Sequence, residues 1–325
     1  GDTWRSASGS RVFDFLMQEN YCIALPLVLT EQEQTSLYEQ SEGSISAISV
    51  PGSIFLLLAD RLDLRPTQLD TQWVEQYIAG PAEDDGVDLE IVRQSLEQVS
   101  VFQLGAKSIF ATRTSGKYIA NYICTFDRQF TSGTLLTPRS LDLIREIFLQ
   151  EKYHLVENNF FSAMATPVLQ HSFLEIYRIL EFVFVLPRAG ALLTQLKSSS
   201  TDLRIEILDF AKSCNRELGW KRIERDSIGR LFREYAVSNY SAFQQLTQEC
   251  TPFSGIQISL NDADEHRNAS LDKIVDKYYT LRNQIVHQFW PEEEITCTSS
   301  DWQALIEFTL DCVSYFYKRY LSKTQ

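Results

Sequence analysis

Apolar residues recur at three- and four-residue steps through most of the chain after about Arg139, a periodicity typical of packed helices. The longest such stretch runs from Phe160 to Leu186 and repeats these side chains: Phe173, Ile176, Tyr177, Leu180, Val183 and Phe184. Further helices are predicted at Leu141–Gln150, Lys221–Val237 and Ser270–Phe289, with a last one from Ser300. About five helices of this length form a bundle. We therefore predict an all-α helical bundle over residues 151–325.

Polar residues and prolines mark the expected ends of these helices. Thr201 and Asp202 are suited to cap a helix that runs to about Leu218. Pro291 is expected to end the helix that begins at Ser270, because proline cannot continue a helix. The last helix opens with a capping-box pattern, in which Ser300 caps the helix and Gln303 reaches back.

Strand patterns and helix patterns both occur in the first 150 residues. Short segments rich in β-branched and aromatic residues predict strands at Val12–Leu16, Cys22–Leu29, Val99–Leu104, Ser108–Thr112 and Lys117–Phe126, with a hairpin turn at 114–116. Helical patterns lie between them at Glu31–Gln40, Thr67–Ile78 and Leu89–Gln98, and residues 80–88 form a predicted acidic loop. We predict an α+β domain over residues 1–150. No nucleotide-binding glycine motif occurs in it, so its role is open, with sensing or regulation as one possibility.

Composition limits the class of protein. Hydrophobic residues make up 44% and charged residues 22% of the 325 residues, which is typical of a folded water-soluble chain with two domains. No uninterrupted apolar run approaches the ~20 residues of a membrane helix. The six cysteines form no CxxC pair, which predicts a cytoplasmic protein without disulfides, metal or cofactor. The net charge of −13 repels nucleic acid overall, so any nuclease here is expected to be selective or regulated.

One segment carries chemical information. Residues 279–287 read Tyr-Thr-Leu-Arg-Asn-Gln-Ile-Val-His, so Arg282 is followed directly by Asn283 and, five residues on, by His287. The motif lies on the penultimate predicted helix of the bundle. Histidine titrates near neutral pH and serves as an acid or a base, whereas arginine offers a permanent, forked donor for phosphate oxygens. These residues suit cleavage of RNA by its own 2′-hydroxyl, with Asn283 able to bind phosphate or orient His287.

This segment resembles the HEPN superfamily, whose active members carry arginine, a polar residue, three to five further residues and histidine on a late helix. The helix around Phe173–Phe182 is similar to an early helix of the ApeA-like branch. The resemblance implies a homodimer of helical bundles that cuts RNA without metal, commonly in toxin or anti-phage defence systems. Some relatives are modified on a tyrosine two residues after the histidine. Phe289 stands there in this chain, so such control at that position is not expected.

Helix geometry places Arg282 and His287 about 140° apart around their helix. Arg282 falls within an apolar stripe formed by Leu271, Ile274, Val275, Tyr278, Ile285 and Phe289. We therefore expect either a composite site, in which Arg282 of one chain meets His287 of the other, or a distortion of the helix near Pro291. The competing hypothesis is that Arg282 is a core arginine paired with Glu175 or Glu181, in a non-catalytic scaffold that binds nucleotide or protein.

A second basic group precedes this helix in the sequence. Arg222, Arg225, Arg230 and Arg233 lie within one broad face of their predicted helix and are candidates to bind an RNA backbone. A run of charges on an amphipathic helix is more often a solvated face, so this RNA-binding assignment is the weaker one.

Overall fold

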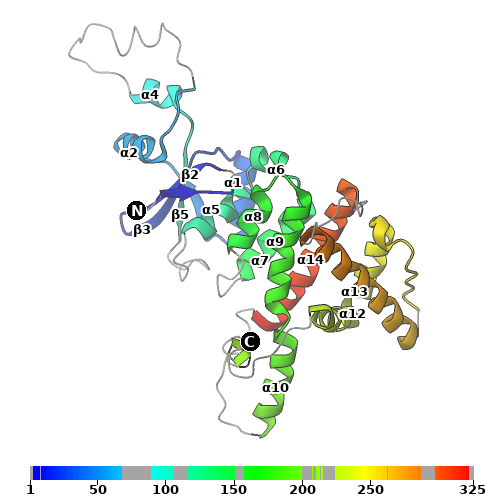
Figure 1. Ribbon diagram of the computed structural model, residues 1–325. Helices are drawn as coiled ribbons and strands as arrows, with labels where there is room; N and C mark the ends of the chain where they lie inside the picture. Colours follow the sequence, from blue (N-terminus) through cyan, green and yellow to red (C-terminus); the bar gives the residue numbers. More distant parts are fainter. Residues whose placement is uncertain are drawn as a thin grey trace, which may run out of the picture. The chain divides into compact units, whose positions relative to one another are not determined.

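The computed structural model describes residues 3–7, 9–67, 89–105, 116–150, 157–199, 207, 210–212, 214, 224–261, 263–286 and 297–321 (Figure 1). The chain forms two compact units, Gly1–Gly133 and Thr134–Gln325. The first combines a sheet with helices and the second is helical, as predicted. Their boundary lies before residue 138 and not at residue 150, because the helix that follows it packs against the last long helix of the chain.

The first unit is built on a five-stranded antiparallel sheet in the order β1-β2-β3-β5-β4. Its strands are β1 (Thr3–Arg5), β2 (Arg11–Met17), β3 (Asn20–Leu25), β4 (Ile45–Ile48) and β5 (Ser100–Leu104). Its helices are α1 (Glu31–Gln40), α2 (Gly52–Leu62), α4 (Leu89–Ser95), α5 (Gly116–Cys124) and α6 (Arg128–Gly133). The predictions for β2, β3, β5, α1 and α4 are confirmed, whereas β1, β4, α2 and α6 were not predicted. The predicted helix at 67–78, apart from Thr67, and the predicted elements at 80–88 and 108–112 lie outside the described residues.

One core of this unit lies between the sheet and α2. Phe13, Cys22 and Val101 from three neighbouring strands pack there with Phe55 and Leu58 of α2, and all five side chains are buried. The pattern arises because alternate residues of a strand share one face, and that face must be covered to exclude water.

The predicted strand at Lys117–Phe126 is wrong, because the chain there forms helix α5. Eight of its nine residues are buried, and Tyr118, Ile119 and Tyr122 have no exposed surface. Burial on all sides removes the apolar–polar periodicity that distinguishes a helix from a strand, and leaves a continuous apolar run. Gly116 is required at its start, because a Cβ atom there would lie 2.5 Å from the hydroxyl oxygen of Tyr21.

The second unit consists mainly of helices. They are α7 (Pro138–Gln150), α8 (Glu157–Ala165), α9 (Leu169–Val183), α10 (Leu186–Ser199), α12 (Glu224–Glu249), the short η1 (Thr251–Phe253), α13 (Asp264–Val286), α14 (Ser299–Phe316) and η2 (Tyr317–Leu321). Helix α14 packs against α7, α9 and α12, and α12 also packs against α13. The helical prediction is confirmed for this half, while the stretch 201–218 lies largely outside the described residues.

Two predicted helix starts are wrong. Helix α13 begins at Asp264, six residues before Ser270, with Asp264 and Glu265 in its first turn, where negative charge is favourable. Helix α14 is capped by Thr298 and Asp301 and not by Ser300 and Gln303. The Oγ1 atom of Thr298 accepts from the backbone N–H of Asp301, and the Asp301 carboxylate accepts from the N–H of Thr298 at 2.7 Å. The side chain of Gln303 instead donates to the carbonyl of Leu135.

Aromatic rings fill the centre of the helical unit. Tyr278 of α13 packs edge-on against Phe173 of α9 and Phe232 of α12, with ring centroids 5.6 and 5.1 Å away. Phe232 also meets Phe308 of α14 at 5.3 Å. The Tyr278 hydroxyl forms a 2.7 Å hydrogen bond with that of Thr309. One shared aromatic core therefore holds α9, α12, α13 and α14 together.

The stretch Leu169–Leu196 is, by length and composition alone, apolar enough to cross a membrane, although charged residues interrupt its apolar ones. In the structure it forms two helices, α9 and α10, and the apolar side chains of α9 are packed inside the bundle. That arrangement is consistent with a core helix of a soluble protein.

The six cysteines are free thiols, five of them buried.

Candidate functional site

Arg282 and Asn283 of the motif lie near the C-terminal end of α13, and Arg282 faces the inside of the bundle. The predicted apolar stripe is confirmed at Leu271, Ile274, Val275, Tyr278 and Ile285, which are all buried. Arg282 lies in this stripe with 18% of its side chain exposed. His287 and Phe289 lie outside the described residues, as does Pro291. The helical distortion expected near Pro291 therefore stays a prediction.

Two carboxylates from two other helices bind the Arg282 guanidinium. Its Nη2 atom donates to the Oε1 atom of Glu181 on α9 at 3.0 Å. Its Nε atom lies 3.1 Å from the Oε1 atom of Glu224, the first residue of α12. Within the described part of the chain this Nε–H donates no hydrogen bond, so the contact with Glu224 is an ion pair of poor hydrogen-bond geometry. Arg282 thus joins α9, α12 and α13.

Asn283 and Tyr177 complete this group, which we call the Arg282 cluster (Tyr177, Glu181, Glu224, Arg282 and Asn283). The Oδ1 atom of Asn283 accepts from Nη1 of Arg282 at 3.1 Å. The guanidinium carbon lies 5.4 Å from the centre of the Tyr177 ring, a cation–π distance. The Tyr177 hydroxyl donates to Glu224. Asn283 therefore contacts Arg282, its neighbour in the motif.

Burial controls the electrostatics of the Arg282 cluster. Desolvation raises the pKa of Glu181 above its ordinary value, the nearby Glu224 carboxylate raises it further, and Arg282 opposes both. Burial, followed by the hydrogen bond to Glu224, raises the pKa of Tyr177, so its phenol is neutral at physiological pH. One guanidinium and two carboxylates carry a formal charge of +1 − 2 = −1 when both acids are ionised.

Of the two partners predicted for a core Arg282, Glu181 is confirmed and Glu175 is wrong. Glu175 instead pairs with Arg178 and accepts a hydrogen bond from Asn159 at 3.0 Å. Glu224 and Tyr177 were not predicted as site residues. Tyr177 was identified only as part of an apolar stripe, and nothing in the sequence near Glu224 indicates that it meets a helix end more than fifty residues away.

The arginine face of α12 is largely neutralised by α13. Arg225 forms an ion pair with Asp276, and Arg233 forms one with Asp272. Arg230 is exposed, and Arg222 lies outside the described residues. Two of the predicted RNA-binding arginines therefore hold helices together on the surface, which favours the solvated-face interpretation.

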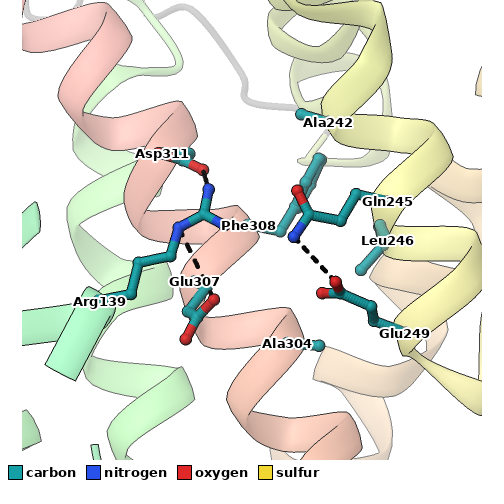
Figure 2. A pocket seen from close by; sticks show the side chains of 9 residues that line it. All are labelled: Arg139, Ala242, Gln245, Leu246, Glu249, Ala304, Glu307, Phe308 and Asp311. Carbon is teal, nitrogen blue, oxygen red and sulfur yellow. Dashed lines mark hydrogen bonds and ion pairs between the residues drawn. The ribbon is translucent and has the colours of Figure 1, made fainter. Parts of the chain in front are cut away.

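A groove lies between α12 and α14 and is bordered by Arg139 of α7 (Figure 2). Arg139 is bound by Asp311 at 2.8 Å and lies 3.8 Å from Glu307, while Gln245 donates to Glu249 at 2.9 Å. With three carboxylates and one arginine, this groove is unsuited to an RNA phosphate.

Within the described ranges, no group of three or more histidine, cysteine, aspartate or glutamate side chains is arranged to hold a metal ion. The chemistry that this region can offer comes from the motif on α13 and the carboxylates around it. Comparison of the chain with family models, with curated proteins and with solved structures gives no match.

Proposed function

We propose that the protein is a metal-independent endoribonuclease of the HEPN type, acting in the cytoplasm as part of a toxin or anti-phage defence system. The proposal rests on one observation: Arg282, Asn283 and His287 follow one another in the sequence in the spacing of that superfamily. The helical unit and the adjacency of Arg282 and Asn283 at the end of α13 support it.

In this mechanism the 2′-hydroxyl of RNA attacks the adjacent phosphorus, and the 5′-oxygen of the next nucleotide leaves. His287 transfers a proton, because imidazole titrates near the working pH. Arg282 stabilises the negative charge that builds up on the phosphate oxygens, and Asn283 adds an amide donor. The products are a 2′,3′-cyclic phosphate and a free 5′-hydroxyl.

Incubation with total RNA in the presence of EDTA tests the proposal. We expect the wild-type protein to generate 2′,3′-cyclic phosphate ends, and His287→Ala to cut at least about 100-fold more slowly, because general acid–base catalysis contributes that much or more. His266→Ala is the matched control, because His266 is an exposed histidine at the start of α13 and lies outside the motif. Activity that disappears on chelation would point to metal-dependent hydrolysis instead.

The alternative is a non-catalytic scaffold that binds nucleotide or protein, and one observation favours it. Both carboxylates of the Arg282 cluster already bind the guanidinium, as in a structural ion-pair network. If wild type and His287→Ala are equally inert towards RNA after dimer formation has been confirmed, the scaffold replaces the nuclease.

The proposed active unit is a homodimer in which Arg282 of one chain and His287 of the other act on one phosphate. A two-fold contact places the same patch on both chains. Mixing Arg282→Ala chains with His287→Ala chains is then expected to restore part of the activity that each lacks, because one site of each heterodimer keeps both groups. The mixture is assayed for RNA cleavage after exchange of chains. The composite site would be contradicted if the mixture regained no RNA cleavage. It would also be contradicted if light scattering showed a monomer with full activity.

A further inference from the structure

The carboxylates of Glu181 and Glu224 contact two different nitrogen atoms on one edge of the Arg282 guanidinium. The Nε and Nη2 atoms of an arginine lie on the same edge, and a phosphate or carboxylate that binds both with two oxygens makes the strongest contact with it. Here each atom faces a different side chain, Glu181 at Nη2 and Glu224 at Nε. The Nε–H, moreover, donates no hydrogen bond to any residue in the described ranges. Both nitrogen atoms of this edge therefore face a carboxylate, but only Nη2 donates a hydrogen bond to one.

The two glutamates are held differently. Glu224 accepts a hydrogen bond from the hydroxyl of Tyr177 as well as facing Arg282. Glu181 accepts from Arg282, and its side chain is the more exposed of the two, at 28% against 22%. Because Tyr177 holds Glu224 in place independently of Arg282, an anion that reaches the guanidinium from solvent would displace Glu181 more easily than Glu224.

We propose that Glu181 occupies the place of an RNA backbone phosphate on Arg282 and withdraws when RNA binds, while Glu224 and Tyr177 keep the guanidinium in position. This inference rests on the proposed function, because it assigns the regulation of the same site. When both of its acids are ionised and no RNA is bound, the Arg282 cluster presents two negative charges and one positive charge to an approaching phosphate. Glu181 thus opposes binding, and Glu224 and Tyr177 act as positioning residues.

The protonation state of Glu181 affects how strongly this side chain competes with an RNA phosphate for Arg282. In the described part of the chain, the charged or titratable groups that face Glu181 are Tyr177 of the same helix, Glu224 of α12 and Arg282 of α13. Protonation of Glu181 removes one of the two negative charges, so the affinity for RNA is expected to rise as the pH falls. Substitution by glutamine has the same effect on charge at every pH and retains an oxygen that can accept from Arg282.

The test measures the affinity for an RNA oligonucleotide methylated at every 2′-oxygen, which cannot be cleaved because its nucleophile is blocked. We expect Glu181→Gln to bind it about ten-fold more tightly than wild type, the effect of removing one like charge at contact distance. Glu175→Gln is the matched control and should bind as wild type does, since Glu175 lies on the same helix but pairs with Arg178. Fluorescence anisotropy of the labelled oligonucleotide gives the dissociation constants, and thermal unfolding confirms that each variant is folded.

A second measurement does not depend on the folding of Glu181→Gln. In the His287→Ala chain, where that histidine no longer titrates, affinity for the methylated oligonucleotide should rise as the pH is lowered, and the rise should begin above the ordinary pKa of a glutamate because the pKa of Glu181 is raised. An affinity in this chain that does not change as the pH falls to the ordinary pKa of a glutamate would overturn the proposal.

The outcomes separate this inference from the proposed function. Cleavage of ordinary RNA by wild type, with Glu181→Gln and Glu175→Gln binding equally, overturns the role of Glu181 and leaves the nuclease standing. Tighter binding by Glu181→Gln, with no cleavage by wild type, supports the phosphate site and overturns the nuclease. Weaker binding by a folded Glu181→Gln also overturns the role of Glu181, because it would make that side chain part of the RNA-binding surface.

Discussion

Replacing Arg282 by alanine is expected to lower RNA cleavage by at least about 100-fold, the usual loss when one donor to the developing charge is removed. The same change leaves Glu181 and Glu224 close together without their shared cation. We therefore also expect the free energy of unfolding of the helical unit to fall by about 2–4 kcal/mol, somewhat less than for a fully buried pair because water reaches the site. Cleavage assays and urea denaturation measure the two effects.

One further variant separates charge from geometry at Arg282, and a second variant, at Arg178, is the control for stability. Arg282→Lys keeps the positive charge but loses the planar fork, so it should recover much of the stability and little of the activity. Arg178→Ala removes an exposed arginine of α9 that pairs with Glu175, and it should change the unfolding free energy by no more than about 1 kcal/mol. A folded Arg282→Ala protein with wild-type cleavage would exclude Arg282 from the mechanism.

Replacing Tyr278 by alanine is expected to destabilise the helical unit by about 3–5 kcal/mol, the range observed when a large buried aromatic side chain is truncated. Tyr278 is fully buried and packs against rings from α9, α12 and α14. Burial raises the pKa of its phenol well above the ordinary value, so a neutral hydroxyl forms the bond to Thr309. Urea denaturation followed by helical circular dichroism measures the loss.

The controls for this change lie at the same and at the next position. Tyr278→Phe removes only the hydroxyl and should cost about 1 kcal/mol, because Thr309 still donates to the carbonyl of Leu305. Tyr279→Ala truncates the same residue type at a partly exposed position and should cost much less than Tyr278→Ala. Equal losses for Tyr278→Ala and Tyr279→Ala would show that the aromatic core does not hold the bundle together.

The sequence by itself determined the elements whose local pattern is distinctive. The helical half follows from apolar periodicity, because an amphipathic helix repeats its buried residues every three to four positions. The strands β2, β3 and β5 follow from short segments rich in β-branched and aromatic residues, and α1 follows from its helical pattern. The same reasoning placed Arg282 in the apolar stripe of α13 and named Glu181 as one of two possible partners, and the structure confirms both.

Only the tertiary structure decided the rest. Helix α5 was predicted as a strand, because burial on every side erases the periodic signal. The cap of α14 lies at Thr298, two residues before the predicted one, because Asp301 also accepts from the backbone of Thr251 and is buried there. Glu224 and Tyr177 reach Arg282 from two other helices. Their meeting depends on how α9, α12 and α13 pack around the shared aromatic core, and no local pattern in the sequence encodes that packing.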